Sequence, residues 1–258
     1  RQHIDTTAMI DLLHRLEQSG IQSQTQAMFT GEKINTSEDR PVLHTALRSN
    51  LSDSNVAQQA YQQAMAVLEQ MEGVIKHLQA TDVTDVISVG IGGSDLGPRL
   101  VLNALADYAK NDFRIHFLSS ADGMYLDRFM ALLNPEHTAV LLVNKTFNTQ
   151  ETLINGEVLK KWMNNPKKIY AITANAKKAI AFDVLPENIL PIWDWVGGRF
   201  SVWSAVAFPT VLSIGMDNFK EFLRGAAAMD EHFLNTPITK NVVAWQAMTS
   251  VWNRNAMG

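Results

Sequence analysis

The sequence predicts an α/β fold, a doubly wound parallel sheet flanked by helices and preceded by a helical N-terminal extension. Four short apolar runs alternate with segments of helical periodicity, at a spacing of roughly 25 to 30 residues that is typical of right-handed βαβ units. Because these runs are apolar throughout, we expect a sheet that is buried on both faces. The four predicted strands are residues 85–90, 115–120, 139–144 and 168–173.

Helical periodicity predicts the elements around these strands. Residues 5–18 and 55–79 carry apolar side chains at helical spacing, and a polar stretch, residues 30–50, separates them. After the last strand, a turn at residues 197–198 leads into a buried helix that is kinked or interrupted near Pro209. Further helical patterns occupy residues 97–109, 124–133, 149–163 and 217–234.

Composition excludes several classes of protein. The chain has 258 residues, a net charge of −4 and no cysteine. This charge argues against a nucleic-acid partner, and the absence of cysteine excludes disulfides, thiolate metal sites and a cysteine nucleophile. The seven histidines are scattered, so we expect no metal site. The longest apolar run, residues 200–216, contains polar residues and falls short of the roughly 20 apolar residues of a membrane span, so we expect a soluble protein.

The first candidate binding site follows the first predicted strand, in "VISVGIGGSDLGPRL" (residues 86–100), where three glycines precede Ser94. A glycine-rich loop at the carboxyl end of a parallel strand presents backbone N–H groups and a helix N-terminus to an anion. A tight turn without a ligand is the alternative, and the local sequence leaves both open. A dinucleotide fingerprint fails because its third glycine falls on Asp95, and a P-loop fails because residues 98–99 are Pro-Arg.

A second candidate site follows the third strand, in "NKTFNTQET". Lys145, Thr146 and Thr149 lie at the start of a predicted helix, and one cation with several hydroxyls at a helix N-terminus suits a phosphate dianion. A capping box formed by Asn148 and Glu151 is the alternative. That alternative leaves Lys145 and Thr146 without a role, so we predict a phosphate site here.

The third candidate is Arg199 in "WDWVGGRFSVW", a guanidinium in an apolar, tryptophan-rich segment. One interpretation is a positive charge that stabilises an oxyanion formed during a reaction. The other is a structural ion pair with a carboxylate such as Asp194. We expect His44 to be a core or interface histidine and Arg40 to be a surface or inter-subunit charge.

These segments resemble, in the same order, the glucose-6-phosphate isomerase (phosphoglucose isomerase) family, and the similarity covers essentially the whole chain. The resemblance implies the sugar isomerase (SIS) fold with a five-stranded parallel sheet. It implies interconversion of glucose 6-phosphate and fructose 6-phosphate, without a metal or redox cofactor, by a cytoplasmic homodimer of glycolysis and gluconeogenesis. The segments are "GEKINTSEDRPVLHTALR", "VGIGGSDLGP", "NKTFNTQET", "WDWVGGRFSVWSA" and "FKEFLRGAAAMDEHFLNTPITKN".

The resemblance also implies roles for individual residues. Arg199 is expected to stabilise the enediolate. Asn144 stands where the family usually has serine and Asn148 where it usually has threonine, although Asn144 still has an amide donor. The sequence further predicts that Gly93→Val weakens sugar-phosphate binding and leaves the fold largely intact. The expected substrate-binding residues are Gly93, Ser94, Asn144, Lys145, Thr146, Thr149 and Gly198.

Finally, the resemblance implies that this chain is an N-terminal portion of the enzyme. Family members are about twice as long, and no segment here matches those that carry their glutamate base, ring-opening histidine and further lysine. We therefore expect a helical or extended segment (1–54), a sugar-phosphate-binding SIS domain (55–236) and the start of a connection to a second SIS domain (237–258). We expect the portion to be inactive alone. The alternative is a non-catalytic regulatory SIS domain.

Overall fold

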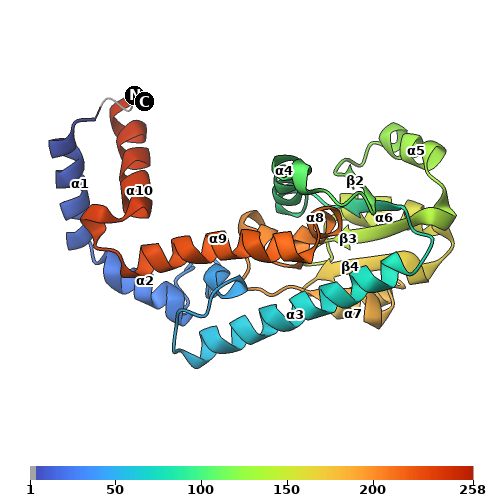
Figure 1. Cartoon of the computed structure of the whole chain (residues 1–258), viewed down its shortest axis with the longest axis horizontal. Coiled ribbons are helices and arrows are strands. Elements are labelled where there is room, and N and C mark those ends of the chain that lie inside the picture. The colour runs from blue at the N-terminus through green and yellow to red at the C-terminus, as the bar shows by residue number, and fades with distance from the viewer. Residues whose placement is uncertain (1–3, 258) are drawn as a thin grey trace.

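A five-stranded parallel sheet forms the centre of an α/β body, and helices from both ends of the chain lie apart from it (Figure 1). This computed structural model describes residues 4–257. The strand order is β2-β1-β3-β4-β5. The strands are β1 (Asp85–Val89), β2 (Arg114–Leu118), β3 (Thr138–Val143), β4 (Ile169–Thr173) and β5 (Ile189–Pro191).

The order of the strands decides where a ligand is expected to bind. From β1 the chain passes to β2 on one side and then returns to form β3 on the other side of β1. The topological switch point therefore lies between β1 and β3, where Val89 is paired with Leu142. Because all strands are parallel, the loops that follow β1 and β3 leave the same edge of the sheet side by side.

Helices cover both faces of the sheet with apolar side chains. One face packs against α3 (Asn55–Gln79), α8 (Phe208–Ile214) and α9 (Met216–Asn235). The opposite face packs against α5 (Gly123–Leu132), α6 (Gln150–Met163) and α7 (Ala176–Ala181). The helix α4 (Leu96–Ala104) follows the first strand and packs on α8.

The predicted fold class and all four predicted strands are confirmed, with boundaries that shift by one or two residues. The predicted helix 55–79 matches α3 at both ends. The predicted interruption near Pro209 is also present, because 3-10 turns at Gly198–Trp203 and Ala205–Ala207 precede α8, and Pro209 lies in its first turn. Proline is tolerated there since the N–H groups of a first turn have no helical acceptor.

Three elements were not predicted from local periodicity. β5 has only three residues, too few to show a pattern, although the family resemblance implied a fifth strand. α7 is a six-residue helix in a segment interpreted as an irregular loop. α2 (Ile21–Thr30) begins directly after Gly20, whose φ of +80° turns the chain so that a second helix starts where the first one ends.

Both ends of the described chain contribute to one helical cluster. α1 (Thr6–Gln18) packs against α10 (Val242–Trp252), and buried Met9, Leu13 and Ala244 lie between them. In Figure 1 these helices stand side by side, far from the sheet. The domain boundaries at 54/55 and 236/237 remain predictions. Within residues 4–257, no helix combines the length and apolarity that a membrane crossing needs.

A buried ion pair connects the N-terminal segment to α9. The Arg48 guanidinium donates from Nε and Nη2 to the two carboxylate oxygens of Asp230, at 2.7 Å each. Both side chains are about nine-tenths buried, and the guanidinium also lies over the Trp203 ring, 4.7 Å from its centre. Such a bidentate geometry compensates for the cost of burying the two charges.

We predict that Asp230→Asn lowers the free energy of unfolding by about 3–5 kcal/mol, because the substitution leaves the buried Arg48 charge without its anionic partner. The measurement is urea unfolding followed by circular dichroism. Asp11→Asn is the matched control, since Asp11 pairs with Arg15 on the exposed surface of α1 and should leave the midpoint nearly unchanged. Equal midpoints for Asp230→Asn and wild type would contradict this account.

Candidate functional site

Three segments meet at the carboxyl edge of the sheet and form the candidate site. We call residues 90–95, after β1, the glycine loop; residues 144–149, after β3, the lysine loop; and residues 193–199, after β5, the arginine turn. A Cβ atom placed on Gly93 would lie 2.0 Å from the Gly198 carbonyl oxygen, so the glycine loop and the arginine turn are in direct backbone contact. The Ser201 hydroxyl, which is buried, donates to the Gly198 carbonyl at 2.7 Å.

Glycine is required in the glycine loop for two different reasons. Gly92 has a φ of +60°, which a residue with a side chain rarely adopts. Gly93 has no room for a side chain because Gly198 backbone atoms occupy the space. The expectation that Gly93→Val leaves the fold largely intact is therefore wrong at the candidate site, because the glycine loop and the arginine turn would have to separate to make room for the side chain. Ser94 lies in the same loop, half-buried, at the end of its 3-10 turn.

The lysine loop is held by its own polar groups. The Asn144 N–H donates to the Ile172 carbonyl at 3.1 Å, which extends the pairing of β3 with β4 by one residue. The Asn144 side chain is buried, donates to the Thr149 carbonyl at 3.4 Å and accepts from the Thr149 hydroxyl at 3.3 Å. These two bonds close the loop on itself. Whether Asn144 and Thr149 also contact a substrate remains a prediction.

The apolar side of the lysine loop is anchored in the core. Phe147 has a φ of +53° and a buried ring, which packs edge-on against Phe182. Thr146, directly before it, is exposed and lies three residues before Thr149, the N-cap of α6. Asn148 is also exposed and accepts a hydrogen bond from Lys178 of α7. The loop therefore directs Thr146 and the N-terminus of α6 to solvent, where an anion can bind.

Lys145 is directed away from the start of α6 and toward the arginine turn. Its Nζ donates to the carbonyl oxygens of Asp194 at 3.0 Å and Val196 at 2.8 Å. The Asp194 carboxylate is 4.0 Å from the same Nζ. Burial is the main cause that lowers the pKa of Lys145, and the positive charge of Arg40 lowers it further. The negative charges of Asp194 and Glu38 oppose this shift. The ammonium thus connects the lysine loop to the arginine turn.

Arg199 is exposed, with its guanidinium over the Phe200 ring at 4.7 Å. Among residues 4–257 it makes no hydrogen bond or ion pair, so the alternative of a structural pair with Asp194 is not formed. The Asp194 side chain is 86 % exposed, and the cation within 4.0 Å of its carboxylate is Lys145. The positive charge of Arg199 is therefore free to act on a ligand.

Two residues that lie at the candidate site, Arg40 and His44, were not predicted to belong to it. Arg40 donates to the Asp194 carbonyl, the same oxygen that accepts from Lys145. His44 accepts a hydrogen bond from the Gly197 N–H at 2.8 Å through Nε2, and its ring lies 4.7 Å from that of Phe200. Both precede the sheet by more than 40 residues, and no local pattern indicated contact. The only signal was their place in a segment that resembles the family.

His44 is neutral at physiological pH. Burial is the main cause that lowers its pKa to about 4, and the nearby positive charges of Arg48, Arg199, Arg40 and Lys145 act in the same direction. Because Nε2 accepts the Gly197 N–H, the ring proton of the neutral imidazole lies on Nδ1. Protonation of Nε2 would replace this acceptor by a donor and break the bond to the arginine turn.

The site as a whole can bind an anion and offer a cation to a reacting group. An anion is favoured at the N-terminus of α6 by backbone N–H groups and by the helix dipole. The three segments that meet here also carry the hydroxyls of Ser94 and Thr146 and the charge of Arg199, which is unpaired within the described residues. No group of three or more side chains suited to hold a metal ion occurs in the described part of the chain.

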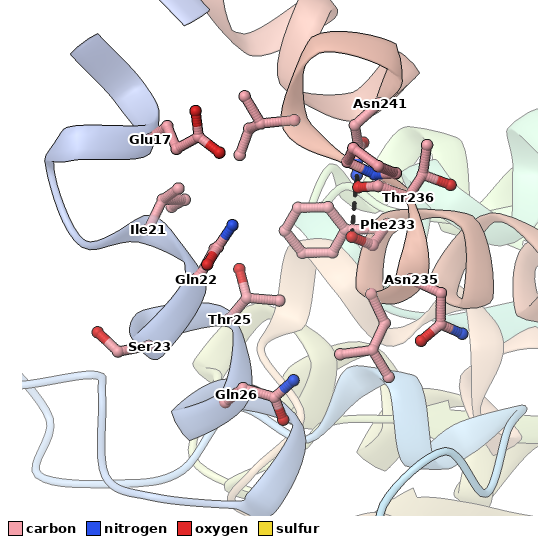
Figure 2. A pocket seen from close by; sticks show the side chains of 13 residues that line it. Glu17, Ile21, Gln22, Ser23, Thr25, Gln26, Phe233, Asn235, Thr236 and Asn241 are labelled. Atoms are coloured by element: carbon pink, nitrogen blue, oxygen red, sulfur yellow. Dashed lines mark hydrogen bonds between the residues drawn. The ribbon is translucent and has the colours of Figure 1, made fainter. Parts of the chain in front are cut away.

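A separate cavity of about 490 Å³ lies between α2 and the end of α9 (Figure 2). Ile21, Gln22 and Thr25 face Phe233 and Thr236 across it. None of its lining residues belongs to the three segments of the candidate site. The predicted site residues therefore group at the sheet edge and not at this cavity.

Comparison with known proteins gives consistent results. A family model described as phosphoglucose isomerase matches residues 1–258. Proteins named glucose-6-phosphate isomerase from Xanthomonas axonopodis pv. citri (strain 306) and Xanthomonas campestris pv. campestris (strain B100) are each 48 % identical over 259 residues, which is 100 % of this chain and 51 % of theirs. The chain thus spans about half the length of these curated relatives.

Solved structures also match this chain over about half of their own length. The crystal structure of a glucose-6-phosphate isomerase from Chlamydia trachomatis D/UW-3/Cx is similar with a TM-score of 0.91 and 28 % identity, over 99 % of this chain and 52 % of that one. A hypothetical protein from Thermus thermophilus has a TM-score of 0.60 at 21 % identity, over 82 % of this chain and 52 % of that one. The second likeness concerns the fold alone.

We predict that Gly93→Ala destabilises the protein and increases amide hydrogen exchange in residues 193–200, because a methyl group at this position overlaps with the Gly198 backbone. Gly73→Ala is the matched control: Gly73 lies in α3 with no atom within 4 Å of the added Cβ. The control should raise stability by about 1 kcal/mol, the difference in helix propensity. Unchanged exchange in Gly93→Ala would refute the contact.

We also predict a pH-dependent contribution of His44 to stability. Its pKa is about 4 in the folded protein against an ordinary value of 6.5, so between these pH values the unfolded chain binds a proton that the folded one does not. The free energy of unfolding therefore falls as the pH falls from 6.5 to 4. His44→Phe has no imidazole to protonate, so its free energy of unfolding lacks this pH dependence. The stability difference between wild type and variant should therefore shrink as the pH falls from 6.5 to 4. A constant difference in urea unfolding would contradict the assignment.

Proposed function

Since the chain belongs to the phosphoglucose isomerase family, we propose that it takes part in the interconversion of glucose 6-phosphate and fructose 6-phosphate. In this proposal the chain binds the phosphate group of the sugar and supplies the cation that stabilises the enediolate. The observation that carries the proposal is the guanidinium of Arg199, which has no hydrogen bond or ion pair within residues 4–257 and lies on a turn in backbone contact with the glycine loop, at the switch point of the sheet.

The phosphate is proposed to bind at the lysine loop. The exposed Thr146 hydroxyl and the free N–H groups at the start of α6 supply donors, and the helix dipole adds a favourable field. Ser94 and the backbone of Gly93 and Gly198 are proposed to contact the sugar, because the glycine loop and the arginine turn adjoin each other. Asn144 and Thr149 shape the loop and complete the set of proposed binding residues.

The reaction requires ring opening, removal of a proton from C2 and its delivery to C1 through an enediolate. Arg199 is proposed to stabilise the negative charge of this intermediate, which is larger than that of the substrate carbonyl. A carboxylate base suits the proton transfer. We propose that the base and the ring-opening acid come from the half of the relatives' length that this chain does not span.

We further propose that the whole enzyme is a cytoplasmic homodimer that acts in glycolysis and gluconeogenesis, as the family resemblance implies. The net charge of −4 supports a small-molecule substrate over a nucleic-acid partner. A non-catalytic role as a sugar-phosphate-binding regulatory domain remains the alternative, and turnover by the full-length protein distinguishes the two.

The proposed function predicts that the chain binds fructose 6-phosphate, but not NAD or ATP, in isothermal titration calorimetry. Thr146→Val should weaken this binding about 10- to 100-fold, because a hydrogen bond to a charged group contributes roughly 1.5–3 kcal/mol. Thr7→Val, on the exposed surface of α1, is the matched control and should bind as wild type does. The chain alone should show no turnover, and the full-length protein should isomerise the sugar. Preference for NAD or ATP would overturn the proposal.

A further inference from the structure

We propose that the ammonium group of Lys145 acts in the reaction by positioning the arginine turn, and not as a ligand of the substrate's phosphate, and that His44 positions the same turn. The inference rests on the proposed function, since it assigns a task to residues of that site. It departs from the sequence-based expectation, in which the cation of the lysine loop binds phosphate.

The backbone of Lys145 is fixed by hydrogen bonds. Its carbonyl oxygen accepts hydrogen bonds from the hydroxyl of Thr173, the last residue of β4, at 3.0 Å and from the N–H of the next residue, Ala174, at 2.9 Å. From this fixed point the side chain, which is only 19 % exposed, extends to the arginine turn. Two of the three ammonium donors are used there, on the Asp194 and Val196 carbonyls.

These two carbonyls depend on side chains for their hydrogen bonds. Val196 is fully buried, and its carbonyl accepts from Lys145. The Asp194 carbonyl accepts from Lys145 and Arg40. A buried acceptor that loses its donor costs roughly 1–3 kcal/mol. If the ammonium turned to a phosphate, the Val196 carbonyl would lose this partner, so the observed arrangement opposes that movement.

The anion site does not need the ammonium. Backbone N–H groups at the start of α6 and the exposed Thr146 hydroxyl are available to a phosphate, and they require no rearrangement of the turn. Lys145 still contributes a favourable field at longer range, because it remains charged. Its direct contacts, however, are with the main chain of the arginine turn.

His44 fixes the next group along the turn. Gly197 follows Val196, and its N–H donates to the neutral imidazole at 2.8 Å. The cations that face this imidazole are Arg40, Arg48, Lys145 and Arg199. Lys145 and His44 together therefore hold three main-chain groups within residues 194–197, and only Gly198 separates this segment from Arg199. Since the guanidinium itself has no polar partner in the described residues, its location depends on the backbone that carries it.

This arrangement predicts how the kinetic parameters respond. The enediolate forms only along the reaction, so a misplaced Arg199 weakens transition-state stabilisation more than substrate binding. Displacement of a catalytic group by about 1 Å can reduce the rate about 100-fold. Loss of a phosphate ligand has the opposite signature, since it raises Kd and KM.

The first test measures the turn itself, on the chain described here. Lys145→Met keeps the aliphatic stem and removes the donors, and His44→Phe keeps the ring and removes the acceptor. In both variants we expect amide exchange in residues 193–200 to increase about tenfold or more, because opening of the turn becomes easier. Lys145→Arg and His44→Gln, which keep a donor and an acceptor, should restore protection in part. Thr146→Val is the control and should leave this exchange unchanged.

The second test measures catalysis in the full-length protein. We expect Lys145→Met to lower kcat about 10- to 100-fold while KM and the Kd of fructose 6-phosphate change less than about threefold. Lys145→Arg should recover part of the loss. Thr146→Val should show the reverse pattern.

Two results would overturn the inference: unchanged exchange of residues 193–200 in Lys145→Met, or a rise in its Kd that matches that of Thr146→Val. If wild type binds no sugar phosphate, the proposed function fails on its own. The exchange experiment still decides whether Lys145 and His44 position the turn.

Discussion

The site depends on hydrogen bonds between side chains and the main chain of the arginine turn. The Asp194 and Val196 carbonyls accept from Lys145, and the Gly197 N–H donates to His44. These groups follow a strand of only three residues and precede a 3-10 turn, so regular secondary structure does not satisfy them. Without the side chains, the segment that carries Arg199 would have unpaired polar groups in a partly buried environment, which is costly.

This dependence explains why distant parts of the chain contribute to one site. The segment that precedes α3 supplies Arg40 and His44, and Arg48 fastens the same segment to α9 through Asp230. The lysine loop, in contrast, is closed by hydrogen bonds within itself, between Asn144 and Thr149. The amide of Asn144 donates one hydrogen bond to Thr149 and accepts another from it, through its nitrogen and its oxygen. The departure from the family's usual serine is thus accommodated inside the loop.

Much of the fold could be predicted from local sequence. Apolar strands of five or six residues and long amphipathic helices such as α3 carry their periodicity within one window. β5 and α7 are too short to show a period, and α2 was hidden because Gly20 only redirects the chain between two helices. The glycine loop and the lysine loop follow strands, as predicted, because glycines, hydroxyls and cations at strand ends are local patterns. The roles of their residues in binding remain predictions.

What the sequence determined by itself was the α/β fold class, the places of the three segments and the family. It could not assign the contacts among them, because these are long-range: Gly93 excludes a side chain only because Gly198 lies against it. Likewise, the sequence showed a lysine beside hydroxyls, which indicates phosphate binding, whereas the tertiary structure directs its ammonium to two carbonyls some 50 residues away. The physical reason is that hydrogen-bond donors pair with whatever acceptor the folded chain brings near, and sequence spacing does not record that distance.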